Sequence, residues 1–124
     1  MTAAVVDFNI EQGATWTHAF IVNQPAPADT PPADLVPMNL TGYTARMQVR
    51  KFMESPHILL ELTTENTRIT ITPLTGRLDL VVSAVATAEL TFSTAVYDLE
   101  IVSSVGVVTR LVKGKITLNP EVTR

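Results

Sequence analysis

The sequence predicts an all-β fold, a single antiparallel β-sandwich of about eight strands with one short crossover helix. Three observations lead to this prediction. Hydrophobic and polar residues alternate with a period of two in many short segments. Turn-forming residues separate these segments at close spacing, which favours antiparallel neighbours. The chain has 124 residues, of which 46% are hydrophobic, so residues 1–124 are expected to form one domain around a single core.

The segment Leu40–Lys51 is predicted to be a central strand, and the other strands are expected to cover one of its faces. The turn signal Thr41-Gly42 leads directly into strict alternation, which is typical of a strand buried on one side. The face predicted to enter the core carries Tyr43, Ala45, Met47 and Val49. The opposite face carries Thr44, Arg46, Gln48 and Arg50.

The outward face of this segment is a candidate partner-binding surface, formed by Arg46, Gln48 and Arg50. Arginine suits ion pairs at interfaces between subunits, which favours a contact with another chain. A solvated sheet face is the alternative, in which Glu61 of a neighbouring strand pairs with the basic side chains.

Two strands are predicted before this segment, over residues 4–10 and 15–22. Both alternate, and the second gathers on one face Trp16, His18, Phe20 and Val22. The connection between the two strands is short, so the sequence predicts a hairpin or a kinked pair.

A proline-rich surface loop follows over residues 24–38, and it holds five of the eight prolines. Proline fixes φ and removes a backbone donor, so this segment is expected to be extended and to lie outside the sheets. Long loops in small domains often carry function. The loop is therefore either an insertion that the domain tolerates or an arm that docks on a neighbouring subunit through Leu35, Val36 and Met38.

Further strands are expected over residues 58–63, 68–72, 77–82, 95–102 and 107–119. One helix is expected over residues 83–90, where Ser83 can cap a short alanine-rich run. With only about two turns, this helix would be a crossover between the two sheets. Gly114 interrupts the last strand, which predicts a bulge or a bend there.

No group of side chains has the spacing of a catalytic or metal site, so neither enzymatic activity nor a cofactor is expected. The two histidines stand far apart in the sequence, and His18 is expected to be half-buried and His57 solvated. Asp98 and Glu100 share one strand face, where solvated carboxylates are more common than a catalytic pair. The chain has no cysteine, which excludes disulfides and thiolate metal sites.

Charge and hydropathy exclude further classes of partner. The net charge of −3 gives no basic footprint for nucleic acid. No apolar run reaches about 18 residues, the length of a membrane-spanning segment, and the N-terminus has no basic region typical of a signal peptide. The sequence therefore predicts a soluble protein that is made in the cytoplasm and binds neither nucleic acid nor membrane.

Five segments carry strand and turn motifs in a characteristic order. The first is Phe8-Asn-Ile-Glu-Gln-Gly-Ala-Thr15, and the most specific is Asn39-Leu-Thr-Gly-Tyr-Thr-Ala-Arg-Met-Gln-Val-Arg50. The others are Gly76-Arg-Leu-Asp-Leu80, then Ser83–Leu90 together with Ala95–Glu100, and finally Arg110–Arg124. Together these segments span most of the chain. They resemble small bacteriophage virion proteins and the N-terminal domain of phage upper baseplate or fibre-attachment proteins.

The domain of that family is an immunoglobulin-like sandwich that fixes a receptor-binding fibre to the phage tail. The resemblance implies a structural component of a virion, and the lack of a helical stalk or fibre shaft favours a tail, baseplate or neck adaptor or a fibre-attachment subunit. It also implies docking onto other virion proteins and self-association in a symmetric ring or fibre base. The expected location is the virion, after synthesis in the host bacterial cytoplasm.

Two alternatives stay open beside the adaptor. One is a capsid decoration protein, and the other is a carbohydrate-binding module that helps a virion adsorb. A carbohydrate-binding module needs exposed aromatic side chains on a platform. The sequence places Trp16, Tyr43 and Tyr97 on predicted inner faces instead.

Overall fold

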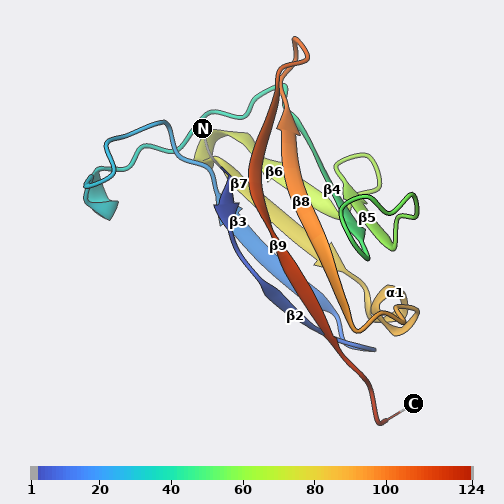
Figure 1. Cartoon of the computed structure of the whole chain (residues 1–124). Coiled ribbons are helices and arrows are strands. Elements are labelled where there is room, and N and C mark those ends of the chain that lie inside the picture. The colour runs from blue at the N-terminus through green and yellow to red at the C-terminus, as the bar shows by residue number, and fades with distance from the viewer. Residues whose placement is uncertain (1–2, 124) are drawn as a thin grey trace.

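The protein consists of two β-sheets packed face to face in a computed structural model that describes residues 3–123 (Figure 1). The larger sheet contains β1 (Ala4–Val5), β2 (Phe8–Glu11), β4 (Thr44–Arg50), β5 (Leu60–Thr63), β8 (Thr94–Val102) and β9 (Val108–Asn119). The smaller sheet contains β3 (Trp16–Ile21), β6 (Ile69–Thr72) and β7 (Arg77–Val82). Helix α1 (Ala84–Ala88) and the 3-10 turns η1 (Pro32–Asp34) and η2 (Pro73–Thr75) complete the elements. The predicted all-β sandwich is confirmed.

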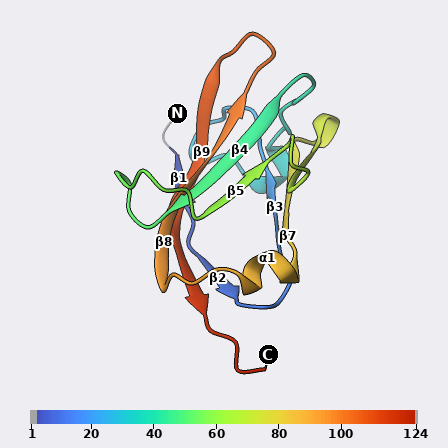
Figure 2. The same ribbon diagram turned by 90° about the vertical axis from the view of Figure 1, so that its right-hand side faces the viewer.

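The strand order makes the sandwich immunoglobulin-like. The larger sheet runs β1-β9-β8-β4-β5, with β2 also on β9, and the smaller sheet runs β3-β7-β6. Strands β3, β7 and β6 stand where the B, E and D strands of an immunoglobulin domain stand, and β4, β8 and β9 correspond to C, F and G. Figure 2 shows the two layers from the side, with α1 at one end of the sandwich.

Strand β4 is central, as predicted, because it pairs with β8 on one side and with β5 on the other. Its inward side chains Ala45, Met47 and Val49 are at most 2% exposed, and the half-buried Tyr43 packs against the same core. Period-two alternation from Thr44 onward therefore places every second side chain of this strand in the core.

Helix α1 connects β7 of the smaller sheet to β8 of the larger one, as the sequence predicts. The Ser83 hydroxyl oxygen caps it by accepting a hydrogen bond from the Ala86 amide at 3.2 Å. Thr87, fully buried, accepts from the Gly13 amide at 3.0 Å and donates to the Ala14 carbonyl at 2.8 Å. The helix is thereby fastened to the turn between β2 and β3.

The first strands form neither the hairpin nor the kinked pair that the sequence predicts. Strands β2 and β3 lie in different sheets, and β1 and β2 both run parallel to β9. The sheets are therefore not purely antiparallel. Alternation specifies which face of a strand is buried, but it does not specify which strand is the neighbour.

Residues Val6 and Asp7 link β1 to β2, and three hydrogen bonds hold this crossing against the larger sheet. The Val6 amide donates to the Lys113 carbonyl at 2.9 Å, and the Tyr97 hydroxyl donates to the Val6 carbonyl at 2.6 Å. The Asp7 carboxylate accepts from the Lys115 amide at 2.9 Å. A Cβ at Gly114 would overlap the Val6 carbonyl oxygen, so only glycine leaves room for this crossing.

The sequence predicts a bulge or a bend at Gly114, and the bulge of this strand lies elsewhere. The register between β8 and β9 shifts between Leu99 and Glu100, which pair with Val112 and Arg110 and leave Leu111 as the extra residue. This shift moves Arg110 out of phase with the buried residues that follow it. Strand β5 also begins later than predicted, because Ile58 is 44% exposed and lies outside the strand.

Burial raises the pKa of the Tyr97 phenol well above its usual range, and the nearby Asp7 carboxylate adds to the effect. The folded state thus holds this proton more tightly than the unfolded chain, so stability falls as pH rises above the ordinary tyrosine value of about 10. We expect Tyr97→Phe to lower the free energy of unfolding at neutral pH by about 1–2 kcal/mol, because the Val6 carbonyl loses its donor.

Urea unfolding of the wild type and of Tyr97→Phe at neutral pH and above about pH 10 measures both effects. The variant should lack the part of the alkaline loss that comes from this phenol. Tyr43→Phe, which replaces the other tyrosine, is the control and should keep that loss. An alkaline loss of equal size in Tyr97→Phe and the wild type would contradict the assignment.

Candidate functional site

The proline-rich segment forms an arm, residues 24–36, that projects from the sandwich (Figure 1). A short antiparallel ladder fixes its base through the bridge between Asn23 and Pro37. The Gln24 amide donates to the Val36 carbonyl at 2.7 Å, just beyond this bridge. Turn η1 (Pro32–Asp34) shapes the distal half of the arm. The arm is therefore anchored at its base and extended beyond it.

The three predicted contact residues of the proline-rich loop divide into two kinds. Met38 is half-buried against the core, and its amide donates to the Val22 carbonyl at 2.8 Å, so it serves the packing of the domain itself. Val36 is 53% exposed and Leu35 is half-buried, and these two supply the apolar surface near the base of the arm. The only charged residues of the arm are acidic, Asp29 and Asp34.

The predicted outward residues of β4 do face away from the core, and each is engaged within the chain. Arg46 Nε donates to the Glu100 carboxylate at 2.9 Å. Gln48 Nε2 donates to the Glu61 carboxylate at 2.9 Å, so Glu61 meets Gln48, its partner in register, rather than an arginine. Arg50 donates to the Gln48 side-chain oxygen and to the Ser55 carbonyl, both at 2.8 Å.

Similar contacts between polar and charged side chains lie elsewhere on the outer face of the larger sheet. Asp98, in the same strand as Glu100, lies 3.4 Å from Arg110 across the β8–β9 pair. The sequence prediction of solvated carboxylates fits these positions, since each acid has one partner on an open face. Surface ion pairs stabilise a fold by about 0–1 kcal/mol, so a partner chain can replace them at little cost.

Aromatic rings gather between β2 and β3. The Phe8 ring centre lies 5.1 Å from Trp16 and 4.8 Å from His18, and His18 lies 4.5 Å from Phe20. His18 is half-buried in this cluster, as predicted, and His57 is exposed. Within residues 3–123, no three acids, histidines or cysteines are grouped so that they could hold a metal ion. The aromatic cluster belongs to the packing of the sandwich, since Phe8 is buried and Trp16 and Phe20 pack against the core.

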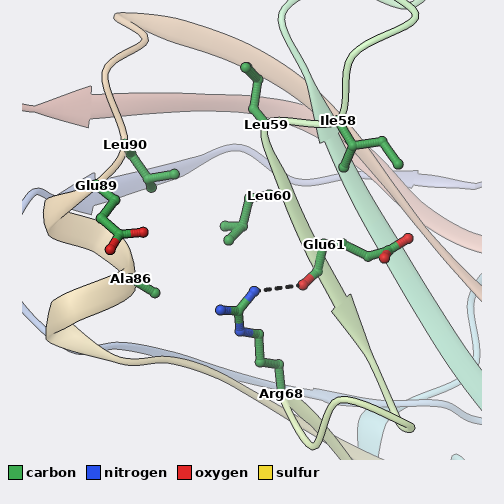
Figure 3. A pocket seen from close by; sticks show the side chains of 8 residues that line it. All are labelled: Ile58, Leu59, Leu60, Glu61, Arg68, Ala86, Glu89 and Leu90. Carbon is green, nitrogen blue, oxygen red and sulfur yellow. Dashed lines mark hydrogen bonds between the residues drawn. The ribbon is translucent and has the colours of Figure 1, made fainter.

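Sequence reasoning missed an apolar surface between β4 and β5. Phe52, Met53 and Ile58 are 52%, 80% and 44% exposed in this loop. Beside it, between β5 and α1, lies an open pocket of about 330 Å³ (Figure 3). The pocket is lined by Ile58, Leu59, Leu60, Glu61, Arg68, Ala86, Glu89 and Leu90. The sequence did contain a signal for this surface, because two large apolar residues, Phe52 and Met53, stand next to each other in a segment predicted to be a loop.

The outer edge of β5 is closed by side chains from the turn that follows it. The Glu61 carbonyl accepts from Arg68 Nη1 at 2.9 Å and from Asn66 Nδ2 at 3.0 Å. The Thr63 amide donates to Asn66 Oδ1 at 2.9 Å. These contacts occupy backbone groups that would otherwise pair with another strand, so this edge is protected.

No protein-family model and no curated protein matches the sequence. In the described part of the chain, no helix is both long enough and apolar enough to cross a membrane. The arm, the outer face of the larger sheet and the strand edges are therefore the features from which a function can be inferred.

Proposed function

We propose that this protein is a structural component of a bacteriophage virion that works by docking onto other virion proteins. The role that fits best is a tail, baseplate or neck adaptor or a fibre-attachment subunit. The observation that carries the proposal is the arm of residues 24–36, which projects from the sandwich on an anchored base (Figure 1). The resemblance of Asn39–Arg50 to phage baseplate domains supports the same role, because this segment contains the central strand β4.

The composition of the arm suits docking. Proline restricts the unbound chain, so an extended proline-rich segment loses less conformational entropy on binding than a flexible loop. Val36 provides an exposed apolar contact near the base, and Asp29 and Asp34 provide negative charge farther out. The complementary partner is a protein surface with an apolar groove and basic residues at its rim.

Immunogold electron microscopy tests the location. Antibodies against the purified chain are applied to phage particles from the bacterial strain that encodes it. We expect label at the tail, baseplate or neck. Label spread over the capsid would replace the adaptor role with a decoration role, and particles without label would overturn the virion proposal.

Shortening the arm tests the contact element. Replacing residues 25–35 with Asn-Gly keeps Gln24 and Val36 as the closing pair of a two-residue hairpin, a geometry that this dipeptide favours. The domain should still unfold cooperatively at a similar temperature, because the removed residues lie outside the core. Supplied to a phage that lacks the gene, the variant should enter particles about tenfold less than the wild type, a loss of about 1.4 kcal/mol.

A point substitution separates loss of the contact from loss of the loop. Val36→Asp places a charge on the exposed surface near the base of the arm and should reduce incorporation. Val105→Asp makes the same change at the turn between β8 and β9, where the valine is 84% exposed, and should not reduce it. Quantitative immunoblots of purified particles compare the two. Unfolding of the shortened variant, or equal incorporation of all variants, would exclude the arm as the docking element.

A further inference from the structure

The smaller sheet ends on an open edge at β3. This sheet has the order β3-β7-β6, and β7 is the neighbour of β3 along its whole length. In immunoglobulin constant domains the corresponding sheet has a fourth strand, A, beside strand B. Here the first strands, β1 and β2, pair with β9 of the other sheet. Among residues 3–123, no strand therefore lies on the outer side of β3.

The register defines the backbone groups at this edge. The Val22 amide donates to the Gly76 carbonyl at 2.7 Å, which continues the pairing of Ile21 with Arg77. In an antiparallel pair, successive residues direct their backbone groups to opposite sides of the strand. The N–H and C=O groups of Thr17, Ala19 and Ile21 thus point away from β7, toward the open edge.

The other edges are short or closed. Strand β5 is closed by Asn66 and Arg68, and β6 has only four residues. Strands β1 and β2 have two and four residues and are interrupted between Val5 and Phe8. Strand β3 has six residues and contains no Lys, Arg, Asp, Glu, Pro or Gly. It therefore lacks the charges, prolines and breaks with which edge strands normally avoid pairing.

We infer that the β3 edge pairs with the β3 edge of a second copy of this chain, antiparallel and about a two-fold axis at Ala19. In this register Ala19 faces Ala19 of the second copy, and Thr17 of each copy faces Ile21 of the other. The two smaller sheets then join into one continuous sheet. A two-fold contact uses the same surface on both copies and closes on itself.

The side chains of β3 are suited to pairing with the same strand of a second copy. The strand carries no Asp, Glu, Lys or Arg, and in this register His18 faces Phe20 of the second copy, so no like charges are paired across the axis. Thr17 and Ala19 are small, exposed and on the outer face, so two strands can approach closely. On the inner face, the half-buried rings of Trp16, His18 and Phe20 gain neighbours, since His18 of one copy lies opposite Phe20 of the other.

This inference goes beyond the proposed function, which concerns docking onto other virion proteins, and its test needs only the purified chain. Sedimentation equilibrium should give a mass that rises with concentration from 13.5 kDa toward twice that value. The result is independent of the particle labelling. A chain that stays monomeric at its highest soluble concentration overturns this inference and leaves the virion proposal to the labelling experiment.

Charge substitutions at the axis test the register. Ala19→Glu and Ala19→Lys each place like charges opposite one another, and each variant alone should dimerise about tenfold more weakly. An equal mixture of the two should recover the dimer, because opposite charges then meet. Ala19→Ser, which keeps the size and the amide, is the control and should dimerise as the wild type does. A mixture no stronger than the single variants would overturn the two-fold pairing.

Ala19→Pro tests the backbone contact. The Ala19 amide points away from β7, so proline there removes no hydrogen bond of the β3–β7 ladder. The variant should unfold near the wild-type temperature yet remain monomeric. A folded variant that still dimerises would overturn the β3 edge as the contact. Unfolding of this variant would contradict the assigned direction of the Ala19 amide. The mixture of Ala19→Glu and Ala19→Lys then tests the contact independently.

Discussion

Replacing Met47 with alanine is expected to lower the free energy of unfolding by about 3–4 kcal/mol. Met47 lies at the centre of β4, between β8 and β5, and is only 1% exposed. The substitution removes buried methylene, sulfur and methyl groups and leaves a cavity that the flanking strands cannot close, since β8 is held between β4 and β9 and β5 is held by four paired positions on β4. Urea denaturation measures the change, and the free energy of unfolding should fall with the same slope against urea concentration in the variant and the wild type.

Arg46→Ala is the matched control in the same strand. The Arg46 side chain lies on the opposite face, is 51% exposed and pairs with Glu100 at 2.9 Å. Its removal should change the free energy of unfolding by less than about 1 kcal/mol. Similar losses in both variants would mean that β4 does not have one buried and one solvated face.

Replacing Gly114 with alanine is expected to cost about 2–3 kcal/mol, the usual penalty for adding atoms to a closely packed site. The new Cβ would overlap the Val6 carbonyl oxygen and lie 2.8 Å from the Val6 carbonyl carbon. The crossing between β1 and β2 must then move away from β9. This displacement also breaks the bond from the Tyr97 hydroxyl to the Val6 carbonyl.

Hydrogen exchange localises this effect. The Val6 amide, which donates to the Lys113 carbonyl, should lose protection in Gly114→Ala while the β4–β8 amides keep theirs. Gly106→Ala is the control, since a Cβ there meets nothing within 4 Å and the positive φ of 87° alone should cost about 1–2 kcal/mol. Unchanged protection at Val6 would show that the first strands do not depend on the space at Gly114.

The sequence predicts the parts of this fold that depend on local pattern. Alternation correctly assigns the buried face of β4, and the Ser83 cap correctly marks the start of α1. Pairing between distant segments has no local signature. The parallel contact of β1 and β2 with β9 was therefore missed, and the role of Gly114 was assigned to a bulge that lies at Leu111.

For the candidate surfaces too, local pattern predicts the direction of a side chain but not its partner. The outward direction of Arg46, Gln48 and Arg50 follows from alternation, but their partners Glu100, Glu61 and Ser55 depend on which strands flank β4. Met38 looks like part of the proline-rich loop in sequence, yet it packs on the core because its amide is bonded to Val22. The open edge of β3 exists only because the first strands pair with β9.

The parallel contact between the first and last strands also determines how the domain responds to mechanical load. When the two ends of the chain are pulled apart, β1 and β2 are drawn along β9 in the opposite direction, so the load is a shear. All six paired positions, Ala4 and Val5 with β9 and the four of β2, then resist together instead of opening one by one. Resistance to force is governed by the rate of unfolding rather than by equilibrium stability. A sandwich with this arrangement resists tension that is applied along its first and last strands.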